Sequence, residues 1–325
     1  MNPSKKSIRY ILHAFLAWSL AGLLAPVTFA ANTIWLSTPT DGNWSTAANW
    51  DTGITPVAGD TLVFTNSAIT STTNDVIVAA NINAITFAAG GDAFSIWGNG
   101  FILNGNVTNA SANAQVINTD VTLNGDRTLI GGAGLTLAGQ GTLLNSGGNR
   151  TLNNWLTNGS SLTINNITLS EAPATARTLT LQGEKGNTTI TGIIANGSTA
   201  SGTMTYAGGG AVTMNGAAAS TYGGTLNVNN GSWLLDFVNL TPAVNLLGGT
   251  NPIALGGGTF GIIGKSTGAT FQTNGVLTLQ GNTGNGLTLT NNGGAGTTLR
   301  VASVTRNGGS SLQINTSAGD SVIAG

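Results

Sequence analysis

The chain has 325 residues and a formal net charge of −1, and only 6% of its residues are charged. That composition excludes the basic patch by which proteins hold nucleic acid or an anionic membrane surface. A hydrophobic share of 40% is too high for a disordered chain, and the absence of cysteine excludes a disulfide framework.

The first thirty residues have the order of a secretory signal peptide. Three basic residues precede an almost wholly apolar stretch at 11–24, and the small-residue ending Thr-Phe-Ala closes at Ala30. The apolar stretch is too short for a good transmembrane helix. We therefore expect cleavage after Ala30 and export of a mature chain that contains no transmembrane helix.

The mature chain would lack histidine as well as cysteine, because the single histidine, His13, lies in the signal segment. It would keep seven basic and eleven acidic residues, a net charge of −4. Histidine general bases, cysteine nucleophiles and zinc sites built from these residues are thereby excluded. We expect no catalytic residue, no cofactor and no metal site, and a location at the cell surface or outside the cell.

The segment 31–60 is rich in tryptophan, with Trp35, Trp44 and Trp50 close together in sequence. The first coil of a repeat stack exposes an apolar edge that needs a cover, and three large apolar rings suit that role. We therefore interpret 31–60 as an N-terminal cap. The alternative is a binding platform on which the three rings stack against sugars.

From residue 61 to residue 325 the chain is a series of short alternating runs. Leu, Ile or Val alternates with Thr, Asn or Gln, and Gly or Asn ends each run, as in 178–183 and 275–282. Alternation with a period of two predicts strands that have one apolar face. The residues expected to point inward are Leu179, Leu181, Leu277, Leu279, Leu287 and Leu289. Those expected to point outward are Thr180, Thr278 and Thr288.

Two all-β architectures fit these runs. One is a parallel β-helix, or β-solenoid, in which successive coils stack, and the other is an antiparallel β-sandwich. The likeness of the runs to one another, and the Thr and Asn residues suited to outward side-chain ladders, favour the β-helix. At a coil spacing of about 4.8 Å and roughly 20–25 residues per coil, the mature chain would form a rod about 60 Å long.

The stretch 208–237, GGGAVTMNGAAASTYGGTLNVNNGSWLLDF, resembles the autotransporter-associated β-strand repeat. The likeness comprises a first strand at 211–216, a turn at 222–224 and a second strand at 225–237. Looser matches such as DGNWSTAANW at 41–50 extend over most of the mature chain. The resemblance implies a right-handed parallel β-helix that is exported to or beyond the outer membrane as a passenger-like surface segment.

Acidic residues are the remaining candidates for chemistry. Asp120, Asp126 and Arg127 lie close together in sequence, and paired carboxylates carry out hydrolysis in many polysaccharide-cleaving enzymes. An Asp beside Asn-Gly is also typical of a turn, which is the simpler interpretation.

Two further charged pairs, Glu171 with Arg177 and Glu184 with Lys185, suggest solvated loop contacts of little energy. The glycine-rich strings lack the Asp of nonapeptide calcium repeats and the Lys of a phosphate-binding loop. We therefore expect no calcium and no nucleotide.

These expectations favour a non-enzymatic structural or adhesive protein that is exported and meets glycans, neighbouring cells or extracellular matrix. The alternative is a polysaccharide-binding or polysaccharide-degrading β-helix protein. The expected organisation is a signal peptide at 1–30, a cap at 31–60 and solenoid repeats at 61–325. Because the alternating pattern runs to the last residue without a cap, we expect a longer protein of which this chain is the N-terminal part.

Overall fold

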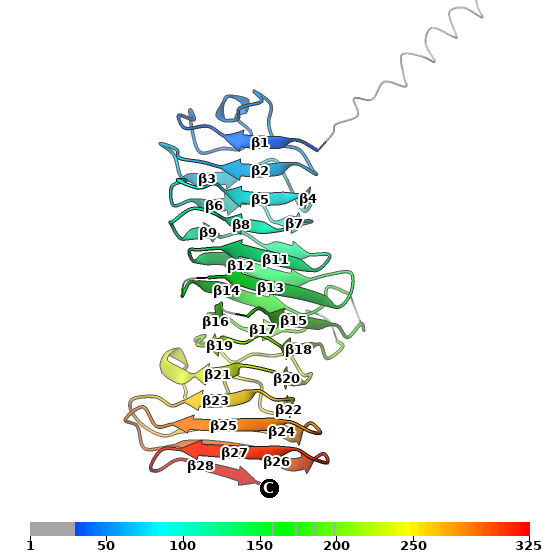
Figure 1. Cartoon of the computed structure of the whole chain (residues 1–325), viewed down its shortest axis with the longest axis vertical. Coiled ribbons are helices and arrows are strands. Elements are labelled where there is room, and N and C mark those ends of the chain that lie inside the picture. Colours follow the sequence, from blue (N-terminus) through cyan, green and yellow to red (C-terminus); the bar gives the residue numbers. More distant parts are fainter. Residues whose placement is uncertain (1–29, 158, 173, 185, 198) are drawn as a thin grey trace, which may run out of the picture.

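The computed structural model describes residues 30–325 except 158, 173, 185 and 198. Over this part the chain is a β-solenoid of about 12 turns, with its N-terminal coil at one end of the stack and its C-terminal coil at the other (Figure 1). The expected signal segment lies almost wholly outside the described residues, so its cleavage stays a prediction.

One sheet of 13 strands runs the whole length of the stack, and each strand pairs in parallel with its neighbour from the next coil. With spacings of about 4.8 Å, 13 strands span about 60 Å, which is the length expected from the sequence. In stacking order the strands are β1 (Asn32–Trp35), β2 (Thr61–Phe64), β5 (Ala84–Phe87), β8 (Val107–Asn109), β11 (Arg127–Gly131), β13 (Arg150–Leu156), β15 (Thr178–Gln182), β18 (Thr203–Tyr206), β20 (Leu226–Val228), β22 (Ile253–Leu255), β24 (Thr270–Leu279), β26 (Thr297–Arg306) and β28 (Ser321–Ala324).

A second sheet of 15 strands covers the remaining sides of the coils. Its main path runs through β27 (Ser311–Thr316), β25 (Gly284–Thr290), β23 (Thr259–Ile263), β21 (Ser232–Asp236), β19 (Ala211–Met214), β16 (Asn187–Ile190), β14 (Ser161–Thr168), β12 (Leu135–Asn145), β10 (Val121–Leu123), β7 (Phe101–Leu103) and β4 (Asn81–Ile82). Beside that path lie β3 (Ser71–Asn74), β6 (Ser95–Gly98), β9 (Gln115–Ile117) and β17 (Ile194–Ala195).

The three coils that begin with β2, β5 and β8 therefore have three strands each, arranged in three columns. Strand β12 joins two of these columns, because its first residues pair with β9 and its last residues pair with β10. It changes direction near Ala138, whose φ of 55° is a left-handed conformation that a non-glycine residue rarely adopts. All pairings between the described strands are parallel, which excludes the antiparallel sandwich.

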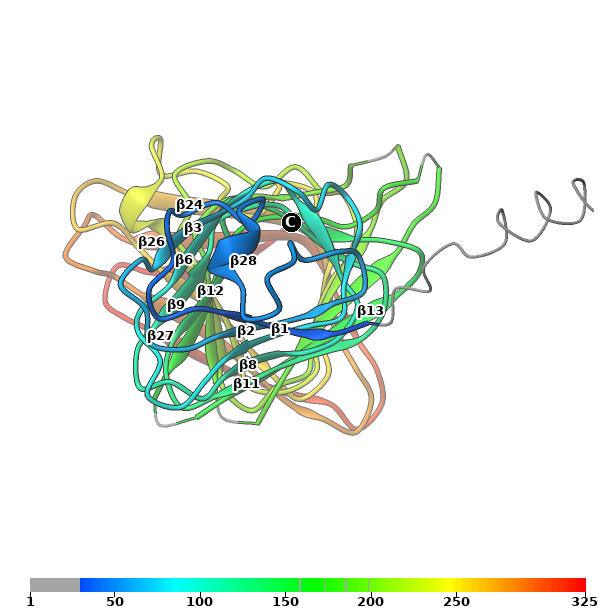
Figure 2. The ribbon, with the colours of Figure 1, turned by 90° about the horizontal axis from the view of Figure 1, so that it is seen from above.

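Figure 2, a view along the stack, shows the strands surrounding a common interior. Apolar residues fill that interior in ladders, because residues at equivalent positions of successive coils are in register. Leu62, Ile85 and Val107 form one such ladder, and all three are fully buried. Each buried aliphatic side chain stabilises the fold by about 1.5–3 kcal/mol.

The six leucines expected to point inward are all buried, so that prediction is confirmed. The threonines between them, Thr180, Thr278 and Thr288, face outward but are partly buried. Neighbouring coils flank each outward side chain, as in the paired ladder Thr151–Thr180–Thr205. Such ladders shield one another from water while leaving the hydroxyl groups on the surface.

Some asparagines differ from the expectation that this residue type faces outward. Asn109, Asn145 and Asn251 are fully buried at corners of the coil. Each donates its side-chain amide to backbone carbonyls; Asn251, for example, donates to the carbonyls of Tyr222 and Gly224 at 2.9 Å. Buried backbone carbonyls need a partner, and these amides supply one where the chain turns.

Coil length varies more than the sequence predicted. The backbone nitrogen of Thr128 bonds Asn106 from a coil 22 residues earlier, whereas Thr178 bonds Asn149 from 29 residues earlier. The longer coil includes the loop between β14 and β15. Extra residues leave the ladder there, so loops change in length without disturbing the strands.

Two short 3-10 turns, η1 (Ala47–Asn49) and η2 (Phe237–Asn239), are the helical elements of the described part of the chain. Within that part, no helix has the length and apolar character required to cross a membrane.

Candidate functional site

The tryptophans of the N-terminal segment lie inside the end of the solenoid. Trp35, Trp44 and Trp50 are 0–1% exposed. Trp50 meets Trp35 and Trp44 edge-on, at interplanar angles of 80° and 83°. All three pack on Phe64 of the next coil, with ring centroids 6.2–6.5 Å apart.

Hydrogen bonds fix two of these rings in the interior. The indole nitrogen of Trp35 donates to the carbonyl of Ile69, and that of Trp50 donates to the carbonyl of Trp44, both at 3.0 Å. A sugar platform requires exposed and roughly coplanar rings, and these rings are neither. The geometry is that of an apolar plug, and the platform interpretation of these three residues does not fit it.

The segment expected as a cap also contributes a strand to the stack. Strand β1 pairs in parallel with β2 over four residues, so the solenoid begins before residue 61. The residues between β1 and β2 pass over the end of the coil, where an antiparallel bridge joins Trp35 to Trp50.

The structure does not bring Asp120 and Asp126 together as a catalytic pair. Asp120 directly precedes strand β10, and Asp126 directly precedes strand β11. Each uses a carboxylate oxygen to accept a backbone hydrogen bond from the next coil, from Thr142 and Thr151 respectively, both at 2.8 Å. Their geometry is that of turn residues that tie one coil to the next.

Arg127 is similarly engaged with backbone and turn groups. Its Nε donates to the carbonyl of Leu103 at 2.6 Å, and its Nη2 donates to Asn124 Oδ1 at the same distance. Burial lowers the pKa of Arg127, and the positive charge of Arg150 lowers it further. Arg127 thus links two coils rather than facing an open cleft.

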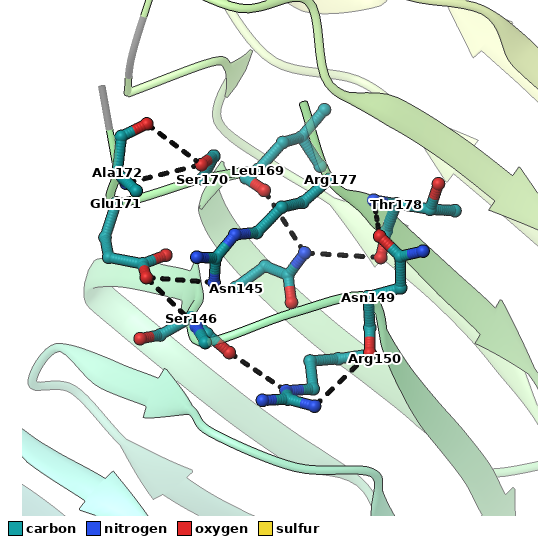
Figure 3. A network of polar contacts seen from close by, with 11 residues as sticks. Asn145, Ser146, Asn149, Arg150, Leu169, Ser170, Glu171, Ala172, Arg177 and Thr178 are labelled. Atoms are coloured by element: carbon teal, nitrogen blue, oxygen red, sulfur yellow. Dashed lines mark hydrogen bonds and ion pairs between the residues drawn. The ribbon is translucent and has the colours of Figure 1, made fainter. Parts of the chain in front are cut away.

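Glu171 and Arg177 form a more ordered pair than the sequence suggested. Arg177 Nη1 lies 2.9 Å from Glu171 Oε1, and the side chains are 12% and 32% exposed respectively. Figure 3 shows the pair above a neighbouring coil, where Glu171 also accepts a hydrogen bond from the backbone of Gly147 at 3.0 Å. Asn145 completes this network by donating to the carbonyls of Leu169 and Thr178.

In the other charged pair that the sequence suggested, Glu184 with Lys185, Lys185 lies outside the described residues. Glu184 is exposed on the surface of the solenoid. Among the described residues, no group of three His, Cys, Asp or Glu side chains is placed to hold a metal ion.

A groove that the sequence analysis did not identify lies beside β13 of the 13-stranded sheet, where β15, β18 and β20 end and their turns begin. It has a volume of about 440 Å³ and is bordered by Trp155 of β13, whose side chain is 55% exposed. A smaller hollow of about 250 Å³ adjoins it and shares Trp155 and Glu184. The polar side chains that line the larger groove are Asn153, Gln182, Glu184 and Asn230.

A sequence signal for this groove exists in the alternation of β13. Leu152 and Leu156 are fully buried, so the residues between them at odd-numbered positions face outward. Trp155 therefore occupies an outward-facing position of the strand, where polar residues are expected and where an apolar ring is not stabilised by burial in the core. An aromatic residue in the outward phase of a strand marks a surface feature that needs its own explanation.

No protein-family model, no curated protein and no solved structure matches this chain. The resemblance of 208–237 to the autotransporter-associated β-strand repeat therefore stands on the residues that carry it.

Proposed function

We propose that the protein is an exported, non-enzymatic structural or adhesive rod, similar to an autotransporter passenger, at the cell surface or outside the cell. The observation that carries this proposal is the use of its carboxylates. Asp120, Asp126 and Glu171 accept backbone hydrogen bonds from other coils, so these acidic groups serve the stack. A regular stack with Thr and Asn on its surface suits repeated weak contacts with glycans, cells or matrix.

Export of the protein and its lack of enzymatic activity can be tested separately. The full chain with a C-terminal tag is expressed in a Gram-negative host, and the tag is followed in cytoplasm, periplasm, outer membrane and medium. We expect a mature protein that begins at Ala31 and is found beyond the cytoplasm. An intact leader on a protein that stays in the cytoplasm would contradict the proposal.

The second candidate function is action on polysaccharides, favoured by the exposed Trp155 and its groove. The purified mature protein is incubated with a panel of plant and algal polysaccharides. We expect no release of reducing ends or unsaturated products. Product release that Asp120→Ala or Asp126→Ala abolishes would replace the structural proposal with an enzymatic one.

A further inference from the structure

We propose that the groove beside Trp155 binds an uncharged glycan chain, with a pyranose ring stacked on the indole. This site deepens the proposed function. It rests on that function in one respect: export must bring the rod to extracellular glycans. Its chemistry follows from three features of the groove: an exposed aromatic wall, a floor of small residues and a polar rim.

The aromatic wall is an apolar surface without an internal partner. Trp155 is 55% exposed, whereas Trp35, Trp44, Trp50 and Trp233 are at most 1% exposed. In the neighbouring coil Ile130 pairs directly with Trp155 and is 42% exposed, so the apolar strip spans two coils. The C–H face of a pyranose covers such a strip, since an indole combines a large apolar face with a polar edge.

Small residues form the floor of the groove in the coils beyond Trp155. Gly183 has a φ of 147°, and a Cβ atom there would lie 1.9 Å from the carbonyl oxygen of Asn154. Only glycine fits so close to the next strand. Ala207 and Gly209 continue the floor in the following coil. The resulting volume, about 440 Å³, falls within the range of small-molecule sites.

The rim carries amide groups in the arrangement that hydroxyl groups require. Gln182 lies directly opposite Asn153 in the sheet and donates its Nε2 to Asn153 Oδ1. This bond fixes both amides and leaves the Gln182 carbonyl oxygen and a second N–H on the surface. Asn230, across the floor, uses its Oδ1 to accept from Gly231 and so presents its NH₂ group. Donors and acceptors in fixed positions match the paired hydroxyls of a sugar.

The charge of the groove selects among glycans. Among the described residues that line the groove, the charged one is Glu184. A carboxylate accepts hydrogen bonds from hydroxyl groups and repels uronate or sulfate groups. The Glu184 carboxylate therefore favours an uncharged hexopyranose chain over an acidic polysaccharide.

The geometry of the stack favours a chain over a single sugar. Trp155 and Asn230 come from coils three steps apart along the sheet, through the pairings of β13, β15, β18 and β20. Steps of about 4.8 Å are close to the length of one pyranose unit, so the groove accommodates about three. An apolar peptide is the competing occupant, and the polar rim disfavours it.

The test uses purified mature protein and isothermal titration calorimetry with soluble oligosaccharides. The uncharged probes are cello-, manno- and laminari-oligosaccharides, and oligogalacturonate is the anionic probe. We expect one or more uncharged probes to bind and oligogalacturonate not to bind. Trp155→Ala should weaken that binding by about thirtyfold, the loss typical of a central aromatic residue in an interface.

Trp97→Ala is the matched control, because Trp97 is 41% exposed on β6 and lines neither hollow. It should change affinity by less than about twofold. Glu184→Gln should keep binding of uncharged probes and admit oligogalacturonate. Circular dichroism and thermal melting verify that each variant is folded.

The proposed site is overturned if no uncharged probe binds, if Trp155→Ala binds as well as wild type, or if both tryptophan variants lose binding equally. A secreted and inert protein that binds no glycan overturns the site alone. A groove that binds glycans in a protein that is never exported overturns the proposed function alone.

Discussion

The backbone nitrogen of Ala31 donates a hydrogen bond to Asp60, with 2.9 Å between Ala31 N and Asp60 Oδ1. Asp60 is 4% exposed, and its second oxygen accepts from the backbone of Val57 at 2.8 Å. Cleavage after Ala30 would convert the Ala31 nitrogen into an ammonium group, which turns a hydrogen bond from a neutral donor to a carboxylate into a hydrogen-bonded ion pair and strengthens it. Processing for export would thereby fasten β1 to the residue that precedes β2.

We predict that Asp60→Asn lowers the free energy of unfolding of the mature protein by about 1–3 kcal/mol, because a buried charge-assisted bond is weakened. Urea denaturation measures this change. Asp51→Asn is the control, since Asp51 is exposed and accepts a bond from Ile34 at 2.7 Å near the same strand. It should have a smaller effect.

The same contact can be tested without a mutation in the folded core. A chain that begins at Ala31 should be more stable than one with two extra residues before it, because the extension replaces the ammonium with an amide. Equal stability of the two chains, together with a neutral Asp60→Asn variant, would show that the ammonium does not contribute.

The N-terminal plug makes a second prediction. Replacement of Trp35, Trp44 or Trp50 by Ala should each cost about 3–5 kcal/mol, because each leaves a cavity beside Phe64. Thermal melting measures the loss, and light scattering should reveal end-to-end association once the first coil is bare.

Trp155→Ala serves as the surface control for these variants, since its ring is 55% exposed. It should melt close to wild type. Unchanged melting of the triple variant at Trp35, Trp44 and Trp50 would rule out the plug as a stabilising element.

The alternation of the sequence predicted the strands and their inward leucines because a period of two is a local property of each strand, and the likeness of the runs favoured the solenoid over the sandwich. The roles of Asp120 and Asp126 could not be predicted in this way. Each depends on which backbone nitrogen of the next coil lies opposite, and coils of 22 to 29 residues shift that partner. The groove at Trp155 likewise requires residues from several coils, whose register is set only by packing.

The inward ladders make a third prediction. Leu279 is 3% exposed and lies next to Leu255 of the preceding coil. Leu279→Asp should cost several kcal/mol or prevent folding, because an unpaired carboxylate would enter the interior. Thr278→Asp is the matched control on the outward face of the same strand, and chemical denaturation compares the two. Similar stability of both variants would contradict the inward orientation of Leu279.

The ion pair of Glu171 and Arg177 predicts a pH dependence. Burial opposes ionisation of Glu171, but the backbone bond from Gly147 and the charge of Arg177 outweigh it, so its pKa lies below the ordinary value of 4.5. A folded-state pKa that is lowered means that the carboxylate stabilises the fold above pH 4.5 and loses this contribution as pH falls through the lowered value.

Wild type should therefore melt at a higher temperature than Glu171→Gln at neutral pH, and the difference should shrink as pH falls below 4.5. The measurement is a series of thermal melts from neutral pH to about pH 3 for both proteins. In an Arg177→Gln background, the difference in melting temperature between Glu171 and Glu171→Gln should be smaller in the same pH range. The reason is that Arg177→Gln removes the cation that favours the ionised carboxylate. A difference that stays constant or grows in acid would show that the pair does not stabilise the loop between β14 and β15.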